Sequence, residues 1–129
     1  MQFVEWLKFG GKRWRVEGIK FYIDGTIDNG TAWLKAPDCY GGGTTSTWHD
    51  LDAYRHAVTF LASQGIPTAT HAIGDAAVEY ALDVLGPVVT ASGAAHRVEH
   101  VETPFSEQAA RFADTGVIAS KRPDSPTPA

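Results

Sequence analysis

Short apolar strands alternate with amphipathic helices along most of this chain of 129 residues, and this alternation constrains its fold more than any other feature. Apolar runs and apolar–polar alternation predict strands over residues 18–24, 66–71, 94–101 and 117–120. Apolar residues at helical spacing predict three helices that begin at Asp50, Asp75 and Ser106 and end at Gly65, Gly86-Pro87 and Gly116. Such alternation favours parallel strands joined by right-handed crossovers, so we expect an α/β fold. The pattern alone does not decide between an open sheet and a barrel.

One long segment interrupts this alternation. Residues 25–47 are rich in glycine, proline, threonine, asparagine and aspartate, which favour turns over helices and strands. We expect a long loop here, and loops longer than about 15 residues in compact domains are often functional. A single domain is expected over residues 1–120, followed by a disordered tail over residues 121–129.

Charge and composition argue against several kinds of partner. The formal net charge of −4 and the pI near 5.6 provide no electrostatic reason to bind nucleic acid or an anionic membrane. The single cysteine, Cys39, excludes an internal disulfide and a cysteine-built zinc site, and it fits a reducing compartment. No apolar run approaches the roughly 20 residues of a membrane helix, and the N-terminus lacks a signal-peptide core. We therefore expect a cytoplasmic protein.

Two histidines stand at the ends of successive predicted strands. His71 ends one strand, and His100 ends the next. Ligands of parallel α/β folds bind at the carboxyl ends of strands, and adjacent strands lie about 4.8 Å apart, so two imidazoles at matched heights can bind one metal ion. The alternative for each is a buried or helix-capping histidine with satisfied hydrogen bonds. We expect the other histidines elsewhere: His96 in a structural role, and His49 and His56 on the surface.

Lys20 lies in mid-strand between apolar neighbours, where an unpaired ammonium is unfavourable. One interpretation is a salt bridge with Asp24 on the same face of the strand. The other is a carboxylated lysine whose carbamate oxygens bridge metal ions. The sequence leaves both open.

Other charged residues near the strand ends also have candidate roles. We expect Arg97 and Glu99 to form an ion pair on the helix-facing side of their strand. Glu102, two residues after His100, is a candidate hydrogen-bond acceptor that orients the imidazole of a metal ligand. Asp75 either caps the following helix or contacts substrate, and the cap is the preferred interpretation.

Together these motifs resemble a known family in order and spacing. The matching segments are Lys20-Phe-Tyr-Ile-Asp-Gly25, Gly30-Thr-Ala32, His71-Ala-Ile-Gly-Asp75, His96-Arg-Val-Glu-His100 and residues 111–117. Over about residues 16 to 120 the chain resembles amidohydrolase family 3, a group within the metal-dependent amidohydrolase superfamily. The histidine motifs are specific in combination, although each alone is a weak signal.

The resemblance implies a distorted (β/α)8 barrel, similar to a TIM barrel, with one or two divalent metal ions, usually zinc, at the carboxyl ends of the strands. A metal-activated water would attack a non-peptide carbon–nitrogen bond of a small-molecule substrate, such as an amide or an N-substituted formamide. By the same resemblance, Lys20 would lie on barrel strand 4 as a carboxylated bridge. His71 on strand 5 and His100 on strand 6 would be metal ligands, with Asp75 and Glu102 at the mouth.

The chain also departs from the family pattern. The superfamily's His-x-His pair and its general-base aspartate are absent from these residues, and a full barrel takes about 250 residues. The chain would supply roughly strands 4 to 7, so we expect no catalytic base within it and little or no turnover by it alone. The alternatives are a non-catalytic half-barrel that self-associates through open sheet edges, and an open-sheet enzyme that merely shares the strand-end histidines.

Overall fold

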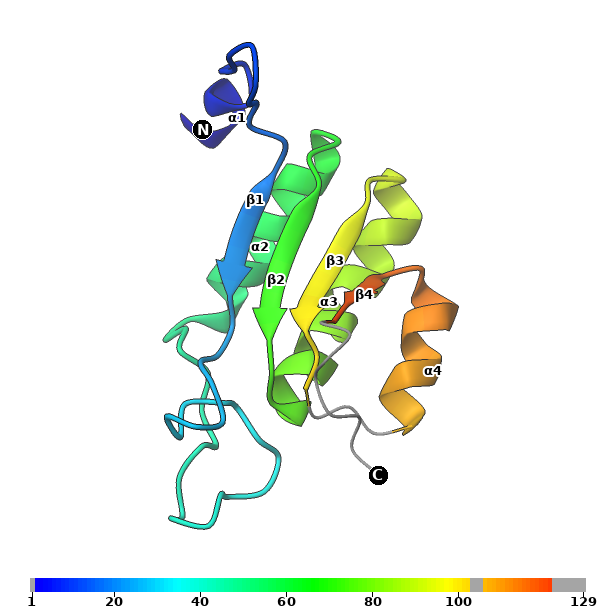
Figure 1. Cartoon of the computed structure of the whole chain (residues 1–129). Coiled ribbons are helices and arrows are strands. Elements are labelled where there is room, and N and C mark those ends of the chain that lie inside the picture. The colour runs from blue at the N-terminus through cyan, green and yellow to red at the C-terminus, as the bar shows by residue number, and fades with distance from the viewer. Residues whose placement is uncertain (1, 103–105, 122–129) are drawn as a thin grey trace.

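The computed structural model describes residues 2–102 and 106–121 of the chain (Figure 1). Four parallel strands form one sheet in the order in which they occur along the chain. They are β1 (Ile19–Tyr22), β2 (Thr68–Ala72), β3 (His96–His100) and β4 (Ile118–Ser120). The α/β class expected from the sequence is therefore confirmed. The expected tail lies outside the described residues, apart from Lys121.

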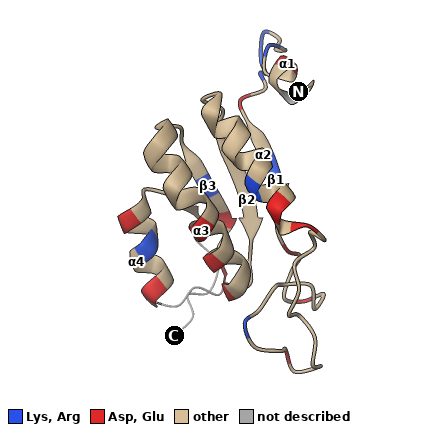
Figure 2. Cartoon of the chain, turned by 180° about the vertical axis from the view of Figure 1, so that it is seen from behind, with Lys and Arg blue, Asp and Glu red and all other residues tan. Residues whose placement is uncertain are grey.

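Each pair of neighbouring strands is connected through a helix. The helices are α2 (Leu51–Ser63), α3 (Asp75–Ser92) and α4 (Ser106–Thr115), and a short α1 (Gln2–Trp6) precedes the first strand. Figure 2 shows the chain from the helix side, where α2 and α3 cover the back of the strands and α4 lies next to α3. No helix in the described part of the chain is long and apolar enough to cross a membrane.

Local chemistry explains the start of α2 but not the end of α3. The Asp50 carboxylate caps α2 by accepting the N–H groups of Asp52 and Ala53 at 3.0 and 3.3 Å, as expected. The expected end of α3 at Gly86-Pro87 is wrong, because the helix continues through Pro87 to Ser92. An interior proline removes one helical hydrogen bond and destabilises a helix by about 3 kcal/mol. Burial of neighbouring residues in the core offsets this loss: Val84, Leu85 and Val88.

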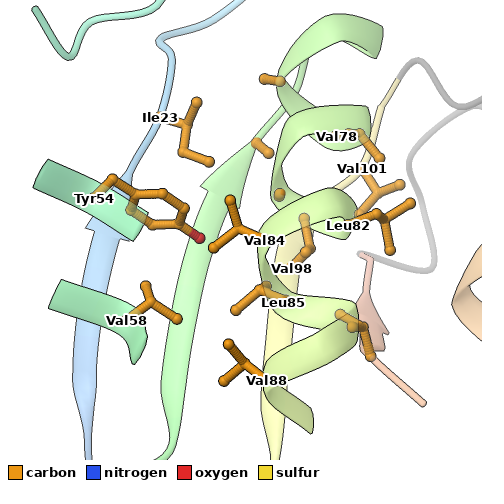
Figure 3. Packing of buried hydrophobic residues seen from close by; sticks show 14 of the residues in the cluster. Ile23, Tyr54, Val58, Val78, Leu82, Val84, Leu85, Val88, Val98 and Val101 are labelled. Carbon is orange, nitrogen blue, oxygen red and sulfur yellow. The ribbon is translucent and has the colours of Figure 1, made fainter. Parts of the chain in front are cut away.

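The core lies between the sheet and the helices (Figure 3). Tyr54 of α2 is fully buried in it, beside apolar residues of α3 and β3 that include Leu85 and Val98. The Tyr54 hydroxyl reaches the Thr70 hydroxyl of β2 at 2.8 Å, which satisfies both buried groups. His96 is also fully buried on this side, where its Nδ1 lies 2.8 Å from the Thr68 hydroxyl. Its expected structural role is confirmed.

Side chains that alternate with this core point to the other face of the sheet. Among the described residues, no helix covers that face. Two rows of register partners cross it, and they are Lys20, Ala69 and Arg97 in the first row and Tyr22, His71 and Glu99 in the second. We call this the helix-free face. Residues 23–50 contain no regular helix or strand and lie at its carboxyl edge.

Arg97 and Glu99 form the expected ion pair, with Arg97 Nε 2.9 Å from Glu99 Oε1. Its expected position on the helix-facing side is wrong. His96 and Val98 occupy that side and are fully buried there, so strand alternation places Arg97 and Glu99 on the helix-free face. The pair therefore belongs to the face that also carries Lys20 and His71.

Candidate metal centre

His71 lies near the carboxyl end of β2 on the helix-free face and is almost completely buried. Its Nε2 lies 2.7 Å from the carbonyl oxygen of Gly25. A carbonyl oxygen only accepts hydrogen bonds, so Nε2 carries a proton, and in the neutral ring Nδ1 is then the nitrogen with a free lone pair. A bare ring nitrogen fixed by a hydrogen bond on the opposite nitrogen is the arrangement that metal-binding histidines use.

His100 ends β3 in a backbone conformation that is unusual for its residue type. Its φ is 81° and that of the next residue, Val101, is 45°. For residues other than glycine, such left-handed backbone costs about 1–3 kcal/mol and clusters at functional sites. Because φ sets the direction of the Cβ atom, this conformation turns His100 away from the helix-facing side that strict alternation would assign to it.

The two imidazoles meet as a result. The ring centroids of His71 and His100 lie 4.6 Å apart at an interplanar angle of 60°. Burial lowers the pKa of His100, and the neighbouring His71 lowers it further. A lower pKa favours the neutral imidazole, which is the form that binds metal ions. The expected convergence of the two strand-end histidines is therefore observed.

Lys20 does not pair with Asp24, so that interpretation of the sequence is wrong. Its Nζ lies 2.7 Å from Glu99 Oε2, across β2 from its own strand. The hydrogen bond to Glu99 raises the pKa of Lys20, and the same bond lowers the pKa of Glu99. This ion pair favours the charged ammonium form of Lys20. Its register partner on β2 is Ala69, two residues before His71.

Asp75 and Glu102 differ in how closely they match expectation. Asp75 is the first residue of α3, and its Oδ1 accepts the free backbone N–H of Ala76 in the first turn at 2.9 Å, as expected of a residue at the helix start. The N-cap position itself belongs to Gly74, one residue before the expected one. Asp75 Oδ1 also accepts the backbone N–H of Lys35 at 2.9 Å, which ties the long loop to the start of the helix. Glu102 is half-buried just beyond β3, and its charge raises the pKa of His100, although burial outweighs this effect.

The remaining histidines do not belong to this cluster. His49 and His56 are both exposed, in the long loop and on α2, as expected. His96 is under the helices on the opposite face of the sheet.

Sequence reasoning missed a residue next to the histidines, Asp24. This residue is 2% exposed, and its Oδ1 lies 3.6 Å from His71 Nε2. It comes two residues after the last strand residue, where strand alternation carries no information on side-chain direction. The chain turns tightly directly after Asp24, because a Cβ on Gly25 would lie 2.0 Å from the Thr31 hydroxyl oxygen.

The two imidazoles fit a pair of nitrogen ligands for one divalent ion. Within the part of the chain that the structure describes, no group of three His, Cys, Asp or Glu side chains is placed to hold a metal ion. The histidine pair is thus two ligands of a site that needs further ligands. Lys20 is a candidate on the same face, and its ion pair with Glu99 occupies its Nζ.

Comparison with known proteins identifies the family. The model of a family described as "Amidohydrolase family" matches residues 2–124. The chain belongs to the amidohydrolase family. Two solved structures resemble this amidohydrolase chain over 93% of its length, and both are uncharacterised metal-dependent hydrolases. The one from Pyrococcus horikoshii OT3 has a TM-score of 0.75 at 27% identity, and the one from Pyrococcus furiosus has 0.69 at 26%.

A curated relative of the amidohydrolase chain is Protein LONG AFTER FAR-RED 3 from Arabidopsis thaliana, with 29% identity over 128 residues. The match covers 93% of this chain and 20% of the plant protein. The chain covers 24% and 25% of the two Pyrococcus proteins. It thus spans about a fifth to a quarter of the relatives it matches. The parallel α/β sheet resembles part of the TIM-like barrel of these metal-dependent hydrolases, the fold class that the sequence motifs predicted.

Proposed function

We propose that this chain is one section of a metal-dependent hydrolase that cleaves non-peptide carbon–nitrogen bonds of amides or N-substituted formamides. In this proposal His71 and His100 bind a divalent ion, with zinc as the metal. The contact between their rings, with centroids 4.6 Å apart at the ends of two neighbouring strands, is the observation that carries it. Support comes from the family and from two similar structures that are metal-dependent hydrolases.

The metal would supply Lewis-acid chemistry, activating water as the nucleophile and polarising the scissile carbonyl. The residues of this chain orient that chemistry. His71 donates its Nε2 proton to the Gly25 carbonyl, which leaves Nδ1 of the neutral ring free to bind the ion, while burial lowers the pKa of His100 and favours its neutral form. Asp75 begins α3 after β2, and Glu102 follows β3, so both lie next to the carboxyl ends of the strands at which substrate would enter. The general base lies outside this chain in our proposal.

We assign Lys20 as a third ligand in its carboxylated form. That chemistry joins the Nζ of a neutral lysine to the carbon of CO2, releases a proton and leaves a carbamate. The ion pair of Lys20 with Glu99 must open first, because it holds the reacting nitrogen. With ¹³C-bicarbonate and zinc present, a carbamate carbon signal is expected from the wild type and not from Lys20→Gln. The same spectrum from both proteins would remove Lys20 from the site.

Measurements of hydrolase activity distinguish this section of the enzyme from a longer chain that contains the missing residues. We expect the 129-residue chain loaded with zinc to show no turnover of N-substituted amides. A longer chain that adds a His-x-His segment before it and an aspartate after it is expected to hydrolyse them. A turnover rate of the short chain comparable with that of the longer one would contradict our proposal that the base lies elsewhere.

A second candidate function is a non-catalytic module that assembles with another copy. It is favoured by the described sheet, in which β1 and β4 are edge strands and Tyr22 and Ile118 on them are 53% and 49% exposed. Unpaired strand edges invite pairing with another chain. Light scattering on the purified chain distinguishes the candidates, because a clean monomer with a cooperative melt would exclude the assembly role.

A further inference from the structure

Asp24 is a buried carboxylate that binds two separate segments of the chain. It follows β1 by two residues and is 2% exposed. Its Oδ2 accepts the N–H groups of Trp33 and Gly74 at 2.9 and 2.8 Å, and its Oδ1 accepts that of Ile73 at 3.0 Å. Three backbone donors thus converge on one side chain.

These donors come from chain segments before and after His71, the candidate metal ligand. Ile73 and Gly74 form the turn directly after β2, so Asp24 fixes the chain just beyond His71. Trp33 belongs to the long loop, and its carbonyl oxygen accepts the N–H of Ala77 in the first turn of α3. The loop, the turn and the helix start are therefore held together around one carboxylate.

The same residue governs the ring of His71. The carbonyl that accepts the Nε2 proton belongs to Gly25, the next residue along the chain. Asp24 Oδ1 lies 3.6 Å from that nitrogen, so its charge also favours a proton on Nε2. The Gly25 hydrogen bond and the Asp24 charge both favour the tautomer in which Nδ1 carries no proton. A hydrogen-bond acceptor on the opposite nitrogen orients a metal-binding ring and increases its strength as a ligand, and here the Gly25 carbonyl is that acceptor while Asp24 adds its charge.

We propose that Asp24 is the positioning residue of the metal centre and that it couples the 25–47 loop to His71. The inference rests on the proposed function, because it treats His71 as a ligand. A purely structural Asp24 would stabilise the turn without selecting one tautomer of His71. The ring tautomer therefore distinguishes the two roles, and it is measurable without any metal.

The first experiment records long-range ¹H–¹⁵N spectra of the histidine rings in the metal-free chain at a pH of about 8.5, where free imidazoles are neutral. In the wild type, His71 is expected to carry its proton on Nε2 alone. In Asp24→Asn it is expected to populate both tautomers. Asp24→Ser, which is smaller and also lacks the charge, serves if Asp24→Asn does not fold. A proton on Nδ1 in the wild type, or one unchanged tautomer in the folded variants, would overturn the proposal.

The second experiment titrates the same proteins with Zn²⁺. Loss of a group that orients a metal-binding histidine weakens metal affinity by about 10- to 100-fold, and that range is expected for Asp24→Asn. Asp38→Asn is the matched control, because Asp38 accepts the N–H groups of Tyr40 and Gly42 within the same loop. Its affinity should equal that of the wild type.

The two experiments separate the inference from the function on which it rests. If zinc does not bind to the wild type but the tautomer changes in Asp24→Asn, the proposed metal centre fails and the positioning of His71 by Asp24 stands. If zinc binds to the wild type and to Asp24→Asn with equal affinity, the coupling is wrong although the metal centre stands.

Discussion

The ring centroids of His71 and His100 lie 4.6 Å apart, although the two residues come from different strands. Strict strand alternation would place their side chains on opposite faces of the sheet. Their backbone register partners are Glu99 for His71 and Ala72 for His100, so the two histidines are not opposite one another in the ladder. The left-handed backbone of His100 brings the rings together. A site built through a strained residue is typical of functional positions, where the surrounding structure maintains the strain.

The first prediction concerns Gly74, over which the long loop passes. A Cβ at this position would lie 1.9 Å from the carbonyl oxygen of Trp33, although the φ of −67° suits any residue. Gly74→Ala should therefore lower the free energy of unfolding by about 3 kcal/mol, the upper part of the range for overpacking. It should also change the tryptophan fluorescence of the folded protein, because Trp33 must move.

Gly65→Ala is the matched control for that measurement. Gly65 has a φ of 72° and nothing within 4 Å of its added Cβ, so only the backbone strain of about 1–2 kcal/mol applies. Urea unfolding of both variants compares the two effects. Equal losses, with unchanged fluorescence in Gly74→Ala, would show that the loop does not pack on this glycine.

The second prediction concerns the buried hydroxyl pair of Tyr54 and Thr70, whose oxygens lie 2.8 Å apart. Tyr54→Phe leaves the Thr70 hydroxyl without this partner in the core and should destabilise the fold by about 1–3 kcal/mol. Adding Thr70→Val removes the unpaired Thr70 hydroxyl as well, so the double variant should recover part of that loss. Urea unfolding of the single and double variants measures the coupling, and strictly additive losses would contradict it.

The third prediction is a loss of stability in acid that depends on His96. Burial lowers the pKa of His96 in the folded state. The unfolded chain, with a histidine pKa of about 6.5, therefore binds the proton more readily, and protonation favours unfolding. The contribution of His96 is fully present above about pH 6.5 and is lost as the pH falls through that value toward the lower folded pKa.

Thermal melts between about pH 8 and pH 5 measure this effect. His96→Gln should be less stable than the wild type at the upper end and should lose less stability on acidification. Some acid sensitivity should remain, because burial also lowers the pKa of His100. The exposed His56 provides the control, and His56→Gln should follow the wild-type curve. A His96→Gln curve parallel to the wild type would contradict the assignment.

Much of the fold followed from local patterns in the sequence. Alternation identified the strand at Ile19–Tyr22, and the Asp50 cap and the glycine at 65 marked the ends of α2. The end of α3 could not be predicted in this way. A proline normally ends a helix, and only the burial of Val84, Leu85 and Val88 by the rest of the fold keeps the helix intact at Pro87.

The candidate site was predicted less completely, for a similar reason. The strand-end positions of His71 and His100 follow from chain order, because parallel strands bring their carboxyl ends together. The partner of Lys20 depends instead on strand register, which places Glu99 two strands away within reach. The role of Asp24 depends on loop residues that fold back onto it, and periodicity does not describe such contacts.

The most direct measurement of the central claim is Zn²⁺ binding by isothermal titration to four proteins: the wild-type chain, His71→Gln, His100→Gln and His56→Gln. We predict that the wild type and His56→Gln bind with the same affinity. Each of the other two should bind at least about tenfold more weakly, a loss of about 1.4 kcal/mol or more. Equal affinity in all four proteins, or no zinc binding by the wild type, would contradict a metal centre at His71 and His100.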